Sequence, residues 1–301
     1  MALPRRPARA YHVVMNITIV DAFTHTPGAG NRAGVVLEAR GLSDAEMLRA
    51  AAAVAASETA FVSAVTPEIQ VRYFTPTSEI DFCGHATIAT LHLLAERKLL
   101  DVPSRPTLMC KAGRLAVTIE GTKAGTRAWI QTPLHPFLPS PFSPEQLFSL
   151  LGAEPRIHDA SLPILGAGGK LFVPVTRQSD LWSLAPRYQA LAAAGTEHDL
   201  HGFYVFTRDV AEAGSAVQAR FFAPARGVRE DPVTGSASGP IGAYLVAQGV
   251  VTAPARLRAE QGDAMGKPGR VDIEVEGRGR VVESVRIGGV AVTVLAGTLT
   301  P

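Results

Sequence analysis

Two stretches of the sequence place titratable side chains next to apolar segments. In "SETAFV" (57–62), Glu58 stands between an apolar helix pattern and an apolar strand pattern. Partial desolvation at such a place would raise the pKa of its carboxyl group toward the range that is useful for proton transfer. In "DFCGHATIA" (81–89), Cys83 and His85 come directly before an apolar run that is typical of a buried helix. These residue types are candidates for an acid/base site.

The second half of the chain repeats this arrangement. The segments 72–94 and 220–245 each run from a strand, through an aromatic-Phe-x-Pro step and a loop, to a Gly-polar-Ala helix start and an apolar helix. The segments 111–119 and 267–275 also match in kind. The sequence therefore indicates a duplication of about half the chain rather than a short solenoid repeat. The paired positions at the helix starts are Cys83 with Thr234, Gly84 with Gly235, and His85 with Ser236.

The two helix starts predict an anion-binding site. If two similar domains pack face to face, both helix N-termini can point into one cleft, where each offers unpaired N–H groups and about half a positive charge. Together they suit a small anion, for which we expect a carboxylate. Gly84 and Gly235 would let the ligand approach the backbone closely. The sequence thus predicts a small carboxylated molecule as the ligand.

Asp231 and His85 complete the candidate acid/base set. Asp231 stands just before the second helix start, in "REDPVTGSA". The dipole of a helix N-terminus disfavours an added positive charge, so we expect a neutral imidazole at His85 that donates one hydrogen bond and accepts another. The residues alone leave other interpretations open. Glu58 can be a surface carboxylate, Asp231 a helix cap, His85 an ordinary helix-start residue, and Cys83 a small buried hydrophobe.

Composition and charge exclude several classes of protein. The chain has 301 residues, a formal net charge of +2 and no clustered basic stripe, so we expect no nucleic-acid partner. No apolar run reaches the roughly 18–20 residues of a membrane-spanning helix, so we expect no membrane partner. The two cysteines, Cys83 and Cys110, are too few for a disulfide framework or a structural zinc site. Their apolar context indicates free thiols and a cytoplasmic protein.

The order of elements predicts two domains of one α/β type. Residues 1–15 are expected to form a disordered N-terminal extension, so that either the first or the second methionine is the true start. Residues 16–125 form the first domain, which the last strand, about 288–301, completes, and residues 126–287 form the second. Strands outnumber helices about two to one, which favours a curved sheet around a buried helix in each domain over a doubly wound sheet.

Capping boxes predict two further helices. Ser43 and Ser143 each stand three residues before a Glu or Gln, which is the pattern of a reciprocally bonded helix start. We therefore expect helices over 43–57 and 143–153.

The ordered set of motifs resembles a known family. "VDAFT…GN", "SETAFV", "YFTPTSEIDFCGHAT", "DPVTGSASG" and "EQG…GR" follow one another as in the phenazine-biosynthesis PhzF family of isomerases, from about residue 16 to near the end. The resemblance implies the diaminopimelate-epimerase fold, an α/β (α+β) fold of two similar domains. Each domain would be a barrel-like sheet around a central helix, with the active site between the two. The resemblance also implies a homodimer that needs no cofactor and no metal.

The resemblance further implies residue roles. The characterised family member isomerises trans-2,3-dihydro-3-hydroxyanthranilate, and a glutamate takes a proton from one ring carbon and returns it to another. By motif match that residue is Glu58, and His85 and Asp231 join it as catalytic residues. We therefore expect a proton shift on this substrate or an analogue. The matching substrate-binding positions are Gly84, Gly235, Ser236, Cys83, Thr234 and Asn31.

Two other functions are hypotheses as well. Diaminopimelate epimerases and proline racemases resemble this fold but use two cysteines, one at each helix start, whereas here Thr234 is the counterpart of Cys83. A hydroxyl group has a pKa far above that of a thiol, so we do not expect a two-thiol racemase. The Cys/Thr pair resembles 3-hydroxyproline dehydratases, so an amino- or imino-acid epimerase or dehydratase that uses Cys83 is the second hypothesis. A non-catalytic protein that binds small carboxylates is the third.

One position departs from the family pattern. Where many members read Gly-Asn-Pro, this chain reads Gly30-Asn31-Arg32. Arg32 adds a cation near a loop that is expected to border the site. It either changes which substrate fits or faces solvent.

Overall fold

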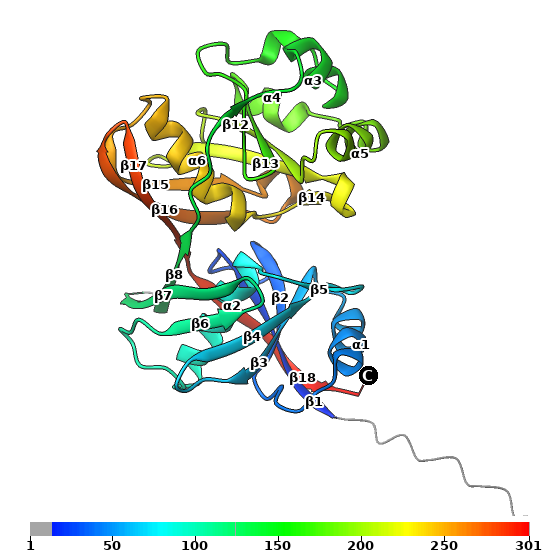
Figure 1. Cartoon of the computed structure of the whole chain (residues 1–301), viewed down its shortest axis with the longest axis vertical. Helices are drawn as coiled ribbons and strands as arrows, with labels where there is room; N and C mark the ends of the chain where they lie inside the picture. Colours follow the sequence, from blue (N-terminus) through cyan, green and yellow to red (C-terminus); the bar gives the residue numbers. More distant parts are fainter. Residues whose placement is uncertain (1–13, 124, 301) are drawn as a thin grey trace, which may run out of the picture.

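The protein forms two lobes that share one continuous sheet (Figure 1). This computed structural model describes residues 14–123 and 125–300. Of the extension predicted over residues 1–15, only residues 14 and 15 are among the described residues. Strand β1 (Met15–Ala22) begins at the last residue of this extension. The side chain of Met15 is buried in an apolar cluster with residues of helix α1 (Asp44–Val54).

The lower lobe in Figure 1 is a curved sheet wrapped around helix α2 (Gly84–Glu96). Ten of the thirteen residues of α2 are buried, because the helix is apolar on almost every side. Helix α1 packs on the opposite face of the sheet, where Phe61 joins its cluster, while Ala60 and Val62 join the cluster around α2. The further strands of this lobe are β2 (Asn31–Val36), β3 (Glu58–Ala64), β4 (Ile69–Phe74), β5 (Glu79–Ile80), β6 (Thr107–Cys110) and β7 (Gly113–Thr122).

The upper lobe repeats this plan around helix α6 (Gly235–Ala247), of whose thirteen residues eleven are buried. Gly242 lets α6 lie close to the sheet, since a Cβ atom there would be 2.6 Å from Cγ2 of Ile273. The outer helices are α3 (Pro144–Leu150), α4 (Gln178–Ser183) and α5 (Tyr188–Glu197), with short 3₁₀ turns at Pro155–Ile157, Pro224–Arg226 and Asp263–Met265. The strands are β8 (Gly125–Thr132), β9 (Leu138–Pro139), β10 (Leu165–Ala167), β11 (Lys170–Pro174), β12 (Gly202–Thr207), β13 (Val217–Ala223), β14 (Val228–Asp231), β15 (Ala253–Gln261), β16 (Gly269–Gly279) and β17 (Val281–Gly289).

The last strand of the chain returns to the first lobe. Strand β18 (Ala291–Leu299) pairs antiparallel with β1, so that Ala291 lies opposite Ala22 and Leu299 opposite Met15. Strand β17, directly before it, instead pairs with β8. The hydrogen-bonded sheet continues from one lobe to the other through the antiparallel pair of β7 and β8. The boundaries of the two expected domains stay a prediction.

The helices begin where the capping boxes predicted and end earlier. Ser43 and Ser143 each accept a hydrogen bond from the backbone three residues on, and the side chain of that residue accepts one in return. Helix α1 ends at Val54 because Ala55 adopts the left-handed conformation. None of the helices in the described part of the chain has the length and apolar character that a membrane span requires.

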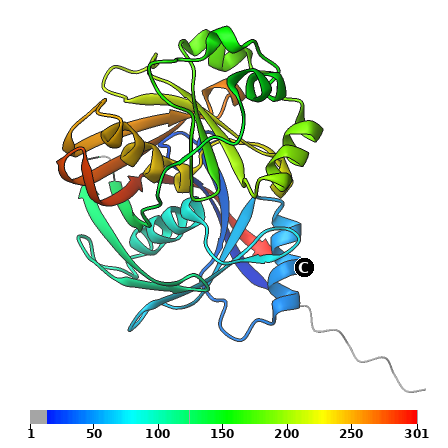
Figure 2. The same ribbon diagram turned by 45° about the horizontal axis from the view of Figure 1, so that its top comes forward.

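The two central helices begin next to each other, where the lobes meet (Figure 2). A Cβ atom at Gly84 would lie 3.9 Å from the Cα atom of Gly235. A Cβ atom at Gly235 would lie 2.9 Å from Cδ1 of Ile287 and 3.4 Å from the ring of Phe23, so a larger residue would force these side chains to move. Both helix N-termini therefore lie at one place in the structure.

The Leu91→Ala variant tests how much the buried helix α2 stabilises the fold. Its side chain is 0% exposed, so Leu91→Ala leaves a cavity, and we expect the free energy of unfolding to fall by about 2–5 kcal/mol. Urea denaturation followed by circular dichroism measures this change. The matched control is Leu295→Ala on β18, where the side chain is 62% exposed and the change should stay within about 0.5 kcal/mol. Equal effects of the two substitutions would contradict the packing of α2.

Candidate active site

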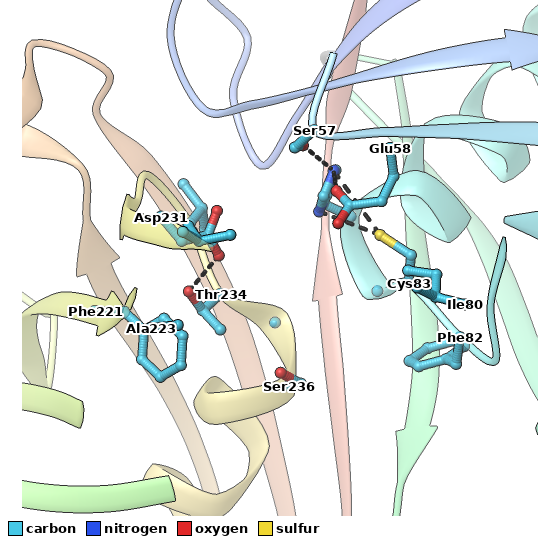
Figure 3. A pocket seen from close by; sticks show the side chains of 15 residues that line it. Ser57, Glu58, Ile80, Phe82, Cys83, Phe221, Ala223, Asp231, Thr234 and Ser236 are labelled. Carbon is cyan, nitrogen blue, oxygen red and sulfur yellow. Dashed lines mark hydrogen bonds and ion pairs between the residues drawn. The ribbon is translucent and has the colours of Figure 1, made fainter. Parts of the chain in front are cut away.

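A pocket of about 180 Å³ lies where the two helix starts meet (Figure 3). Figure 3 shows Glu58 and Cys83 on one side of it, and Asp231 and Thr234 on the other. Apolar side chains of both lobes complete the walls: Ile80, Phe82, Phe221, Ala223, Val228 and Val233. The polar and glycine residues that line the pocket are Ser57, Glu58, Cys83, Gly84, His85, Asp231, Thr234, Gly235 and Ser236. Eight of the residues that the sequence singled out are among them, and the ninth, Asn31, lies behind Asp231.

The first wall carries a close cluster around the imidazole ring of His85. Nε2 of His85 lies 3.2 Å from Oε2 of Glu58 and 3.2 Å from Oγ of Ser57. Sγ of Cys83 lies 3.4 Å from Nδ1 of the same ring. The cluster joins two separate segments of the chain, since Ser57 and Glu58 stand at the start of β3, and Cys83 and His85 at the start of α2. Ser57 was not among the predicted site residues, although it is the first residue of the "SETAFV" motif.

The charges of this cluster differ from those expected. Burial lowers the pKa of His85, but the contacts with the Cys83 sulfur and the Glu58 carboxylate raise it, and this pKa ends well above its ordinary value. Burial is the largest single effect on the pKa of Glu58 and raises it, but the contacts with His85, Ser57 and Cys83 together lower this pKa below its ordinary value. The predictions of a neutral His85 and of a raised pKa at Glu58 are therefore wrong. Opposite charges 3.2 Å apart, together with the contacts that both groups make with Cys83, outweigh the cost of burial.

Asp231 is the carboxyl group whose pKa lies near neutrality. Burial raises the pKa of Asp231 to about 6, against the opposing effects of the His85 charge and of hydrogen bonds. Its Oδ1 accepts a 2.8 Å hydrogen bond from Nδ2 of Asn31, and its Oδ2 accepts a 2.5 Å bond from Oγ1 of Thr234. The N-cap residue of α6 is Thr234, so the alternative of Asp231 as the helix cap does not hold. Its position on the pocket wall makes it available to a ligand.

A glutamine from a distant strand holds the second wall in place. Oε1 of Gln261, at the end of β15, accepts a 3.1 Å bond from the N–H of Thr234. Its Nε2 donates to the carbonyl oxygen of Asp231 at 2.8 Å and to Oγ1 of Thr234 at 3.1 Å. The sequence analysis used this residue only as part of the "EQG" motif, because a buried amide leaves no local pattern that shows what it contacts. Gln261 thus fixes the loop that carries Asp231.

The start of each central helix lacks a side-chain cap. Cys83 and Thr234 are the N-cap residues of α2 and α6, and neither side chain bonds to a backbone N–H of its helix. The first N–H groups of two helices therefore point toward one pocket, with the partial positive charge of both dipoles. Such an arrangement can hold a small anion such as a carboxylate.

Arg32 does not reach the pocket walls. Its Nε donates a 2.8 Å bond to Oδ1 of Asp21, and its Nη2 a 3.0 Å bond to Oδ2, so the buried Asp21 carboxylate holds the guanidinium. The side chain of Arg32 is 48% exposed. Of the two expected outcomes, the structure favours an arginine that faces solvent.

The chain is similar to proteins of one family along nearly its whole length. The model of the family described as phenazine biosynthesis-like protein (PhzC-PhzF) matches residues 20–297. The chain belongs to this family. An uncharacterized isomerase of Deinococcus radiodurans is 36% identical and covers 95% of each chain. The uncharacterized isomerase YddE of Escherichia coli K12 is 35% identical, over 91% of this chain and 94% of its own length.

Solved structures agree with this PhzF membership. The PhzF-family protein of Bacillus anthracis is 33% identical, with a TM-score of 0.89 over 95% of this chain and 99% of its own. A hydroxyproline epimerase of Agrobacterium vitis, at 12% identity and a TM-score of 0.57, shares the fold alone. The predicted family and the predicted diaminopimelate-epimerase-like fold are confirmed, and the chain is a PhzF-like isomerase.

The raised pKa of Asp231 predicts that the folded protein loses stability as the pH rises. The ordinary pKa of an aspartate is 3.8, and burial raises that of Asp231 to about 6. At a pH between these two values, Asp231 therefore keeps its proton in the folded protein but has lost it in the unfolded chain. Stability from this group is therefore lost as the pH rises from about 4 through about 6. Relative to Asp231→Asn, we expect the parent to lose about 2–3 kcal/mol of unfolding free energy between pH 4 and pH 7.5. Urea denaturation over a pH series measures this, and a pH-independent difference would contradict it.

Proposed function

We propose that this protein is a cofactor-independent isomerase that moves a proton between two carbon atoms of a small carboxylated molecule. The substrate we propose is trans-2,3-dihydro-3-hydroxyanthranilate or a close analogue, bound in the pocket of Figure 3. The observation that carries this proposal is the pairing of an ionised Glu58 with a protonated His85, opposite a half-buried Asp231 whose pKa is about 6. At neutral pH this pocket therefore holds the Glu58 carboxylate as a proton acceptor and the His85 imidazolium as a proton donor.

Glu58 is the base in this mechanism. Its pKa is lowered, so the carboxylate is ionised at neutral pH and can accept a proton from a substrate carbon, then return it to another. The His85 imidazolium keeps this carboxylate charged and can donate a hydrogen bond to a polar substrate group. Apolar walls such as Phe82 and Phe221 limit water in the pocket, which strengthens these interactions.

The helix starts and Asp231 position the substrate. The uncapped N-termini at Gly84 and Gly235 suit a carboxylate. Asp231 faces this place from the second lobe, with Asn31 and Thr234 as hydrogen-bond donors. With a pKa of about 6, it can accept or donate a hydrogen bond to a substrate amine or hydroxyl group.

A thiol mechanism is the weaker candidate. Burial raises the pKa of Cys83, so the thiol keeps its proton at neutral pH. In the second lobe its counterpart, Thr234, donates its hydroxyl hydrogen to Asp231 and therefore does not offer it to a substrate. These two observations argue against an epimerase or dehydratase that relies on Cys83.

The Glu58→Gln variant tests the proposed base. The amide keeps the shape of the side chain but cannot accept the proton, so we expect turnover to fall by a factor on the order of 10²–10⁴. Turnover is measured with trans-2,3-dihydro-3-hydroxyanthranilate in deuterated water, by product formation and by deuterium incorporation. Full activity in this variant would sink the assignment of Glu58.

Cys83→Ala separates the two mechanisms in the same assay. We expect turnover within about tenfold of the parent, since the thiol transfers no proton in the proposed reaction. A loss as large as that of Glu58→Gln would favour the thiol mechanism. If the parent binds small carboxylates by calorimetry but converts none of them, the protein is a binding protein rather than an enzyme.

A further inference from the structure

Three side chains of different chemistry meet on one wall of the pocket. One ligand atom each of Glu58, Cys83 and His85 lies within 4.8 Å of the other two. A carboxylate oxygen, a thiolate sulfur and an imidazole nitrogen are the donor types that bind Zn²⁺ in proteins. The proposed proton transfer uses Glu58 and His85 but needs no thiol.

The distances between these atoms fit the edges of a tetrahedral zinc site. With Zn–N and Zn–O bonds of about 2.1 Å and a Zn–S bond of about 2.3 Å, tetrahedral ligands lie about 3.4 Å apart for N and O and about 3.6 Å apart for N and S. Nε2 of His85 lies 3.2 Å from Oε2 of Glu58 and 3.8 Å from Sγ of Cys83. These two separations are each about 0.2 Å from the ideal edge, and the third, between a carboxylate oxygen of Glu58 and Sγ, is below 4.8 Å. Because Sγ lies closer to Nδ1, at 3.4 Å, the thiol must turn away from Nδ1 when an ion binds to Nε2.

A second observation points to a ligand at the same atoms. Oε2 of Glu58 is buried, and among the described residues it has an ion-pair contact with His85 but no hydrogen bond of good geometry. This oxygen therefore depends on the positive charge of His85, and a coordinated cation would replace that charge when the imidazolium loses its proton. The sulfur and imidazole donors favour Zn²⁺ over Mg²⁺ and Ca²⁺, which prefer oxygen ligands.

We propose that Glu58, Cys83 and His85 form a Zn²⁺-binding site whose occupation inhibits the enzyme. On binding, the thiol and the imidazolium lose their protons to solvent, and sulfur, nitrogen and carboxylate oxygen each donate an electron pair to the ion. All three side chains line the pocket, so a water molecule or a ligand in the pocket completes the coordination shell. The ion then holds the carboxylate that proton transfer needs. The inhibition rests on the proposed function, whereas the binding does not.

Cobalt(II) is a suitable probe because its absorption reports which atoms bind it. We expect titration of the full chain with Co²⁺ to give a thiolate-to-cobalt charge-transfer band and the visible bands of four-coordinate cobalt, both removed by Zn²⁺. Cys83→Ser should lose the charge-transfer band, whereas the matched variant Cys110→Ser should keep it. Absence of the band in the parent, or the same band in Cys83→Ser, would overturn the site.

Alkylation of the parent protein gives a readout that needs no variant. We expect saturating Zn²⁺ to slow the reaction of Cys83 with iodoacetamide by a factor on the order of ten or more, because a coordinated thiolate is not free to react. The reaction of Cys110, followed in the same digest by mass spectrometry, is the internal control and should not change. Equal rates at Cys83 with and without Zn²⁺ would overturn the proposal.

The metal site and the proposed function can fail separately. If both hold, Zn²⁺ abolishes turnover and a chelator restores it. Cobalt binding through Cys83 in a chain whose Glu58→Gln variant is fully active would support the site and overturn the function. An inactive Glu58→Gln variant in a chain that gives no thiolate band would overturn the site alone.

Discussion

The close approach of two helix starts is the constraint on which the rest of the site depends. Gly84 and Gly235 meet where the lobes join, and at Gly235 a side chain would collide with Ile287 of the sheet. Because both helices are buried along most of their length, neither can shift to make room. The residues before and after the two glycines are therefore held on facing walls of one small pocket. Titratable groups from distant parts of the chain therefore meet in this pocket.

Charge in the pocket is distributed unequally between the walls. On the first wall, Glu58 and His85 stabilise each other as an ion pair, which keeps both charged despite their burial. On the second wall, Asp231 has hydrogen-bond donors but forms no ion pair with any described residue, so burial outweighs the more distant charge of His85 and raises the pKa of Asp231. Two carboxyl groups in one cavity therefore have opposite protonation tendencies, which is the usual basis for dividing acid and base roles between them.

Much of the fold could be predicted from local patterns. The capping boxes at Ser43 and Ser143 specify helix starts through contacts within four residues, so no tertiary information was needed. The apolar character of the segments after Gly84 and Gly235 predicted two buried helices for the same reason. The ends of helices were predicted less well, since a left-handed residue such as Ala55 leaves no clear pattern in the sequence.

The sequence by itself determined the duplicated plan, the family and the residue types at both helix starts, because these are properties of order and spacing along the chain. Only the tertiary structure decided the protonation states, since the pKa of Glu58 or His85 depends on the 3.2 Å between them and not on either local segment. It also decided which residues support the site. Gln261 reaches Asp231 from another strand, and Asp21 holds Arg32 away from the pocket. Contacts between residues distant in sequence follow from packing, which no local pattern encodes.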